Sequence, residues 1–389
     1  MNTFIFKKAL PVSLLAAAGL ILTPAAQAMS FKASGQIDRA LTYANNGKQS
    51  DIASVDNNGS NSRFRFTGSQ DMSNGIKVGF HYEIGLTQLP SSSWDIGQNS
   101  NGSVQLDTRI VDAFMQGEFG TLSFGKGNGA AYYANTMDLS GTNFIGGGVW
   151  YELYSAGITF VDSAGQSIAT IGKVMSPFNA IGRQNRVRYD SPSFGGLVLS
   201  GSYDNGGASE LAARYKANLG DGAKFIAGAS WVNTGNQGIT TDPGTGIVTV
   251  GSTDYTRLKI YNGAASLLLA NGLNFTVSMG HQETNKVTSQ GTYSQKGYNA
   301  TNYFGQVGYI VGQNHFVVNY GQTKDMMYKG VKGSQIGAAY VYNWTNAIQL
   351  YASYHNYKLN LPSYVKTGMG VGNAQDINQL FIGTRIKFM

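Results

Sequence analysis

The sequence is poor in several residue types that common protein classes need. Its 389 residues include no cysteine and only seven prolines, and 13% of them are charged, against about 25% in soluble domains. Without cysteine there is no disulfide framework, no thiolate metal site and no thiol nucleophile. The low charge and the 52 glycines disfavour an ordinary soluble α/β enzyme.

Long apolar runs are also lacking after the first 28 residues. A membrane-spanning helix needs about 20 consecutive apolar residues, and fragments such as 264–270 are too short. The class that remains is a β-rich membrane protein, in which apolar and polar residues alternate along each strand.

The N-terminus has the features of a secretory signal peptide. Lys7 and Lys8 precede an apolar stretch, 9–22, and a small-residue cleavage motif, Ala26-Gln27-Ala28. Residues 1–28 are therefore predicted to be removed, leaving 29–389 as one domain. Loss of the two lysines lowers the net charge from +7 to +5, which is weaker than nucleic-acid binding requires, so no nucleic-acid partner is expected.

Alternation with a period of two residues recurs from residue 30 to the end. In the last segment Leu380, Ile382 and Phe388 share one face, and Arg385 and Lys387 share the other. Sixteen such segments are predicted to be strands: 30–46, 60–72, 76–88, 104–119, 121–126, 184–194, 196–205, 209–219, 223–235, 255–270, 273–285, 300–311, 314–325, 333–344, 347–359 and 376–389. An even number of strands, with short turns alternating with long connections, predicts an all-β, transmembrane antiparallel β-barrel.

The longest connection, 127–183, is either a functional loop or contains further strands. The stretch 157–171 alternates around a turn like a hairpin. It could decorate the loop, or it could add two wall strands and make eighteen. We favour the decorated loop because the two arms are short, and we expect this third long loop to fold into the lumen as a constriction.

The hydrophobic pattern also predicts a strand register near the N-terminus. A two-residue turn at Asn74-Gly75 would mix the two faces, so a longer connection that pairs Gly68 with Tyr82 is preferred. This register turns Arg63, Arg65 and Glu83 toward the lumen.

A second strand repeats this pattern. Because Val187 and Tyr189 face outward, Arg186 and Arg188 are predicted to face inward. The loop carries three acids: Asp138, Glu152 and Asp162. If the loop folds inward, these carboxylates are predicted to face the arginines and to set up a transverse field that discriminates between ions.

Several stretches resemble the Gram-negative general diffusion porins. They are the run from Ser62 to Glu83, the segment 117–126 before the long loop, the segment 185–196 after it, and the last strand ending in Phe388. The resemblance implies a homotrimer of 16-stranded barrels in the cell outer membrane, in contact with membrane lipids and lipopolysaccharide. It also implies a water-filled pore in each subunit, narrowed by the third loop.

The family's constriction arginines correspond to Arg63, Arg109 and Arg188. Arg109 shares sequence parity with the outward Val111, so it reaches the lumen only if a β-bulge occurs near Ile110. Lys126 stands where the family usually has arginine, and we include it among the pore-lining residues.

Catalysis is not expected. The four histidines are far apart in the sequence without metal-binding spacing, and there is no nucleophile elbow and no phosphate-binding loop. No catalytic residue, cofactor or metal is therefore predicted. The expected function is passive diffusion of ions and small hydrophilic solutes, with weak anion preference. Two alternatives stay open: a barrel whose surface loops act as an adhesin, and a substrate-specific sugar or anion channel.

Overall fold

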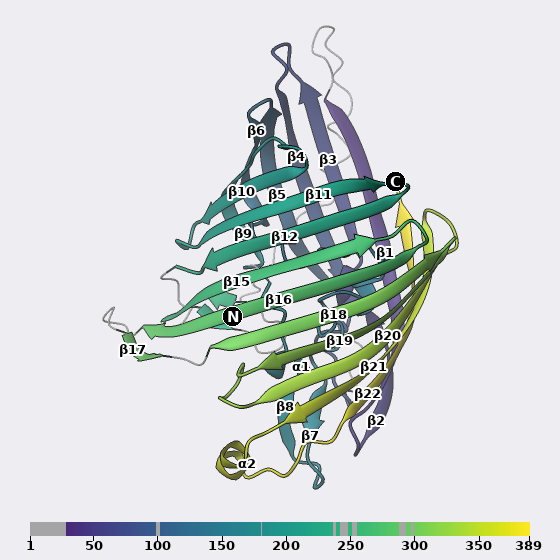
Figure 1. Ribbon diagram of the computed structural model, residues 1–389, viewed down its shortest axis with the longest axis vertical. Coiled ribbons are helices and arrows are strands. Elements are labelled where there is room, and N and C mark those ends of the chain that lie inside the picture. The colour runs from purple at the N-terminus through teal and green to yellow at the C-terminus, as the bar shows by residue number, and fades with distance from the viewer. Residues whose placement is uncertain are drawn as a thin grey trace, which may run out of the picture.

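The structure is a computed structural model that describes residues 29–98, 102–179, 181–235, 239–241, 248–250, 255–287, 293–296 and 299–389. The predicted signal segment, 1–28, lies outside these residues. The described part forms a closed antiparallel β-barrel (Figure 1).

Sixteen wall strands are present among the described residues, and two of them are interrupted. In chain order they are β1 (Ser30–Asn45), β2 (Ser50–Asp56) continued by β3 (Arg63–Asp71), β4 (Lys77–Thr87), β5 (Gln105–Gly117), β6 (Gly120–Asn128), β9 (Arg183–Asp190), β10 (Leu197–Asp204), β11 (Ser209–Gly220), β12 (Ala223–Asn233), β15 (Tyr255–Leu268), β16 (Leu273–Val287), β17 (Tyr293–Lys296) continued by β18 (Ala300–Val311), β19 (Asn314–Lys324), β20 (Lys332–Asn343), β21 (Ile348–Asn360) and β22 (Ile377–Phe388). Pairing of β1 with β22 closes the barrel.

The predicted strand count is confirmed, but the second strand was predicted too short. Its N-terminal half, β2, pairs with the C-terminal half of β1, and its C-terminal half, β3, pairs with the N-terminal half of β1. A kink between them contains the short 3-10 helix η3 (Asn58–Ser60). The kink interrupts the alternation of apolar and polar residues, so β2 was not recognised as part of the second strand.

The connections differ between the two rims. On the rim that holds both barrel termini, the connections are short: 72–76, 118–119, 191–196, 221–222, 269–272, 312–313 and 344–347. The opposite rim carries the long connections, including 88–104, 129–182, 325–331 and 361–376. The last of these contains α2 (Ser363–Met369). Outer-membrane barrels have this asymmetry, with long loops on the extracellular side.

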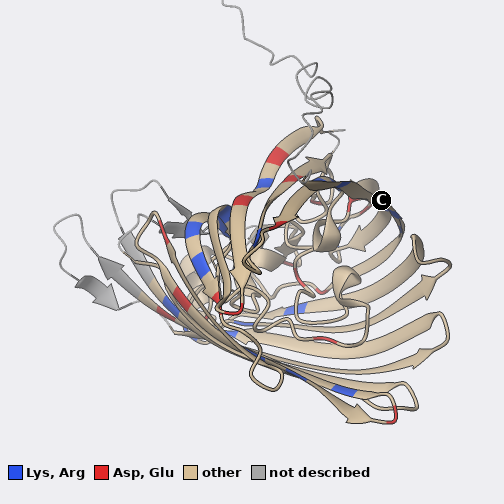
Figure 2. Ribbon diagram, turned by 90° about the horizontal axis from the view of Figure 1, so that it is seen from above, with Lys and Arg blue, Asp and Glu red and all other residues tan. Residues whose placement is uncertain are grey.

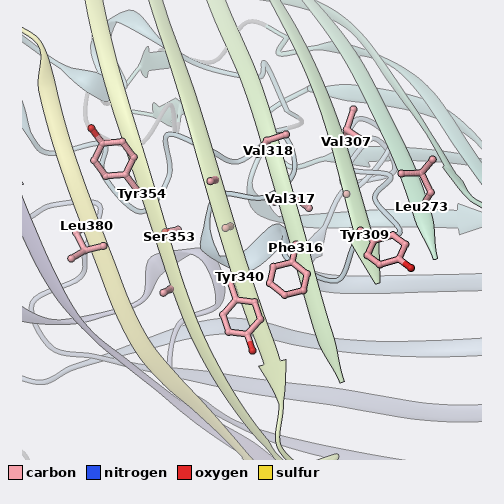
Figure 3. A pocket seen from close by; sticks show the side chains of 14 residues that line it. Leu273, Val307, Tyr309, Phe316, Val317, Val318, Tyr340, Ser353, Tyr354 and Leu380 are labelled. Carbon is pink, nitrogen blue, oxygen red and sulfur yellow. The ribbon is translucent and has the colours of Figure 1, made fainter. Parts of the chain in front are cut away.

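The outward face carries an apolar belt, as alternation requires. Its exposed side chains include Val277, Tyr303, Val318, Ile336 and Tyr354. An apolar groove of about 510 Å³ lies on this face. Figure 3 shows side chains that line it, among them Tyr309, Phe316 and Tyr340. Because these side chains share the lipid-facing side of the wall, the groove lies outside any path for a polar solute.

The segment 129–182 lies against the inward-facing side chains of the wall. Gly148 N donates to Gln306 Oε1 at 2.6 Å, and Asn319 Nδ2 donates to Gly146 O at 2.8 Å. Tyr154 is hydrogen-bonded to His355 at 2.5 Å. A large buried cluster reinforces these bonds, and its bulkiest members include Trp94, Phe144, Tyr151, Tyr154, Phe160, Tyr351, Tyr357 and Phe381.

Short elements shape this segment from within. They are η4 (Asn143–Ile145), β7 (Thr159–Val161), β8 (Ser167–Thr170) and α1 (Ile171–Val174). The pair β7–β8 forms a two-stranded sheet of its own, so the hairpin decorates the loop and adds no wall strands. A second small hairpin joins β13 (Ile239–Thr241) to β14 (Val248–Val250). No helix in the described residues is both long and apolar enough to cross a bilayer.

Candidate constriction site

A buried carboxylate on β4 gathers three arginines. The Glu83 side chain is 1% exposed, and its Oε1 lies 3.5 Å from Arg63 Nη1. Arg65 Nε donates to Glu83 Oε2 at 2.8 Å, and Arg109 Nε donates to Oε1 at 2.6 Å. Three guanidinium groups therefore share one negative charge on the inward face. Figure 2 shows Lys and Arg segments close to Asp and Glu segments on strands of the barrel wall.

The register that forms this cluster differs from the predicted one by two residues. Phe66 pairs with Tyr82 and Gly68 pairs with Phe80, across a five-residue connection. The faces are nevertheless those predicted, because a shift of two residues conserves them. Arg65 lies directly opposite Glu83 rather than diagonally from it.

Arg109 joins the cluster through a β-bulge. Glu83 pairs with Ile110 and Ile84 pairs with Thr108, so Arg109 is the extra residue between them. A bulge interrupts the alternation of side chains, and this interruption brings Arg109 to the same face as Glu83. The conditional prediction of a bulge near Ile110 is thus confirmed.

A second ion cluster lies on β5 and β9. Arg186 Nη2 donates to Asp112 Oδ2 at 2.7 Å, and both side chains are 6% exposed. His81 Nδ1 lies 2.8 Å from the other carboxylate oxygen. Arg186 also donates to the backbone carbonyls of Gly125 and Asn128. It therefore fixes the chain where β6 ends and the long loop begins.

A third cluster surrounds Asp190 and has the same anchoring role. Arg188 donates through Nε and Nη2 to the two oxygens of Asp190, at 2.8 and 2.7 Å. Its Nη1 donates to Gly129 O at 2.8 Å. Arg214 lies 3.6 Å from Asp190 Oδ1 and donates to Ala130 O. The two arginines consequently hold the first residues of the loop against the wall.

Lys126 does not belong to these clusters. It pairs with Val111 and Asn185, on the same face as Leu122 and Phe124. Because Phe124 and Val111 are exposed on the apolar side, Lys126 projects outward near the end of β6. Its assignment to the pore lining is corrected by this register.

The loop carboxylates have partners other than arginine among the described residues. Asp138 accepts hydrogen bonds from Ser140, Thr276 and Gln306. Asp162 caps the β7–β8 turn and also accepts from Gly372 N at 2.9 Å. Neither acid is paired with the wall that carries the arginine clusters.

Glu152 is buried in the apolar cluster of the loop, and its Oε2 has no hydrogen-bond partner in the described structure. Burial raises the pKa of this carboxyl group to about 8, because desolvation penalises the charged form. At neutral pH Glu152 is therefore mostly protonated. The structure does not provide the acidic loop face that the sequence suggested.

Three loop aromatics occupy the place expected of these acids. The rings of Tyr132 and Tyr133 meet edge to face with centroids 4.3 Å apart, and each lies 6.1 Å from Trp150. Arg183 Cζ lies 5.7 Å from the Tyr132 ring centroid. These aromatics were not predicted as site residues, although Tyr132 and Tyr133 are adjacent in the loop sequence.

The described residues contain no group of three or more His, Asp or Glu side chains arranged to hold a metal ion. The arrangement at the inward wall is one of fixed charges, with six arginines sharing three carboxylates. Such an arrangement acts on passing solutes through its field and its shape.

Known structures share this architecture. The anion-selective porin of Comamonas acidovorans matches over 93% of this chain and 100% of its own, at 16% identity and a TM-score of 0.61. The trimer form of OmpT from Vibrio cholerae matches over 93% and 100%, at 14% identity and a TM-score of 0.56. OmpF of Salmonella typhi, solved with daunomycin, covers 92% and 97% at 14% identity and a TM-score of 0.56.

At these identities the structural matches establish the fold alone. A comparison with curated protein sequences finds no match. The family model of the Gram-negative porins, however, matches residues 12–360. This match spans most of the sequence and includes every arginine of the three clusters, and it shows that the chain belongs to the Gram-negative porins.

Proposed function

We propose that this passive diffusion channel of the outer membrane, indicated by its family and fold, prefers anions weakly, and that the arginine clusters and the segment 129–182 form its constriction. The observation that carries the proposal is the excess of arginine over carboxylate in these three ion clusters.

Four arginines, Arg63, Arg65, Arg109 and Arg183, supply most of this positive charge. Glu83 is the acid that pairs with Arg63, Arg65 and Arg109, and Arg183 has no ion pair among the described residues. The long loop lines the wall from β10 round to β22. This leaves the part formed by β3 to β9 as the charged side of the passage. Fixed positive charge beside a narrow aqueous path lowers the energy of anions relative to cations.

Assembly and export follow the same proposal. We infer a homotrimer, since the related OmpT of Vibrio cholerae has a trimer form, with each barrel in contact with lipid and lipopolysaccharide. Export would use residues 1–28 as a cleaved signal. No cofactor and no covalent chemistry enter the proposed mechanism, because solutes cross down their own gradients.

The test is the zero-current reversal potential of the purified mature trimer in a planar bilayer under a KCl gradient. The variant that combines Arg63→Ser and Arg65→Ser removes two charges from the Glu83 cluster and spares the arginines that anchor the loop. We expect wild-type selectivity for chloride, and a shift toward potassium in the variant. The difference should shrink at 1 M salt, where the Debye length falls to about 3 Å.

Lys126→Ser is the matched control, because it removes a positive charge from the outward face. Equal shifts in both variants would contradict the assigned constriction, since net charge alone would explain them. Absence of conductance from a folded trimer would favour the alternative, a barrel that presents its surface loops as an adhesin.

A further inference from the structure

The passage has an aromatic side as well as a cationic side. Tyr133 is 48% exposed, and its backbone φ is +74°, a left-handed conformation that residues with a side chain rarely adopt. Such strain persists only where the surrounding structure enforces it. Here it presents the Tyr133 ring beside Tyr132 and Trp150 at the edge of the passage.

The cationic side contains an arginine with unused hydrogen-bonding capacity. Arg183 lies over the Tyr132 ring, and its Nε is buried without a hydrogen-bond partner in the described structure. The Arg65 side chain is 46% exposed. Guanidinium groups donate hydrogen bonds to carboxylates. Arg65 Nε and Nη2 already donate to Glu83, so its Nη1 is the donor left for a solute carboxylate.

The two sides meet at Arg183, whose Cζ lies 5.7 Å from the Tyr132 ring centroid. The Tyr133 ring lies 4.3 Å from that of Tyr132, so one small molecule can reach both surfaces. A planar ring bearing a carboxylate matches this pair of surfaces, since its ring can stack on the tyrosines while its charge meets a guanidinium.

We propose that the constriction favours aromatic carboxylates over aliphatic carboxylates of the same charge and size. This inference rests on the proposed function, because it assumes that solutes pass between the arginines and the loop. The interaction must be weak for throughput, since a site in a channel has to release its solute as readily as it admits it.

The experiment compares sodium benzoate with sodium cyclohexanecarboxylate in planar bilayers. Both probes are six-membered-ring monocarboxylates, and only benzoate has a π-system. Their permeabilities relative to chloride are obtained from bi-ionic reversal potentials of the trimer. We expect the wild type to pass benzoate about threefold better than cyclohexanecarboxylate.

Tyr133→Leu should reduce this ratio toward one, and Trp150→Leu should reduce it independently. Tyr203→Leu is the matched control, because Tyr203 is exposed on the outward face of β10 and should leave the ratio unchanged. Tyr133 is itself half-exposed, so its replacement spares the buried packing. Retained chloride selectivity in each variant reports an intact pore.

Equal permeability of the two probes in the wild type, with chloride selectivity intact, would overturn this inference and leave the proposed function standing. An unchanged ratio in both loop variants would overturn it equally, because the preference would then arise elsewhere. A wild-type trimer that shows no chloride selectivity would instead refute the proposed function, and this inference with it.

Discussion

Arg109 Nε lies 2.6 Å from Glu83 Oε1 because a β-bulge turns Arg109 out of its sequence parity. The bulge adds a third guanidinium to a carboxylate that Arg63 and Arg65 already bind. Without the bulge, Arg109 would face the apolar side with Val111, where an arginine at the bilayer midplane costs about 2 to 4 kcal/mol. One inserted residue thus determines the charge of the candidate constriction.

Neutralising Glu83 should strengthen anion preference. Glu83→Gln keeps the shape of the side chain and removes the negative charge shared by three arginines, so the chloride-to-potassium permeability ratio should rise, on the order of twofold. Reversal potentials in a KCl gradient measure it. Asp71→Asn is the control, since Asp71 forms an exposed pair with Lys77 at the strand end. An unchanged ratio in Glu83→Gln would mean that solutes do not pass this cluster.

Removing one partner of the buried Asp112–Arg186 pair should cost more stability than removing both. Arg186→Met leaves the buried Asp112 carboxylate with His81 but without its arginine, and should destabilise the protein by about 3 kcal/mol. Combining it with Asp112→Leu should recover much of that loss. Thermal unfolding in detergent, followed by circular dichroism, measures both variants.

The exposed pair Lys358–Asp376 provides the comparison for this prediction. Asp376→Asn should change stability by less than about 1 kcal/mol, because exposed ion pairs contribute little. If Arg186→Met changed the stability as little as Asp376→Asn, burial of the Asp112–Arg186 pair would not contribute to stability, contrary to our interpretation.

Glycine permits close contact between loop and wall at Gly321. A Cβ there would lie 2.5 Å from Tyr151 Cε1, whereas a Cβ at Gly305 on the neighbouring strand would meet nothing within 4 Å. Gly321→Ala should therefore weaken loop packing by about 1 to 3 kcal/mol, and Gly305→Ala should not. Limited proteolysis within 129–182 measures the difference. Equal cleavage rates in the two variants would show that the Tyr151 contact does not hold the loop.

Burial of Glu152 should make stability depend on pH. Its pKa is raised to about 8 from an ordinary value of 4.5, so between these values the folded protein holds a proton that the unfolded chain releases. The contribution is full below pH 4.5 and is lost as the pH rises to about 8, at no more than about 1.4 kcal/mol per pH unit.

The Tm of the wild type should accordingly fall between pH 5 and pH 8, and Glu152→Gln should flatten this dependence. Glu118→Gln, at an exposed turn, should retain the wild-type slope. Identical slopes for all three proteins would indicate that Glu152 stays ionised in the folded state.

Much of the barrel could be predicted from sequence because each strand carries its own evidence. Alternation is local, so the strands and their faces follow from neighbouring residues. Register is less local, and the pairing of Phe66 with Tyr82 depends on a turn length that the residues 72–76 do not specify. The kink after β2 could not be predicted because it interrupts the alternation of apolar and polar residues on which strand prediction depends.

The loop acids illustrate where sequence reasoning failed. Asp138 is satisfied by Thr276 and Gln306, neutral residues more than a hundred positions away. No charge pattern signals such partners, and opposite charge alone suggested the arginines. The bulge at Arg109 was predicted as a condition, because the family resemblance placed Arg109 in the lumen while its sequence parity pointed outward, and a local irregularity reconciles the two.

The bonds that hold the long loop also have a consequence for the order of assembly. Tyr154 reaches a partner 201 positions later in the chain, and Ser155 reaches partners 202 and 224 positions later. Closing such long stretches is entropically costly and slow. The loop cannot complete its contacts until β21 and β22 are in place. The newly inserted barrel is therefore expected to begin as a wide ring, and its narrow passage to be the last feature to form.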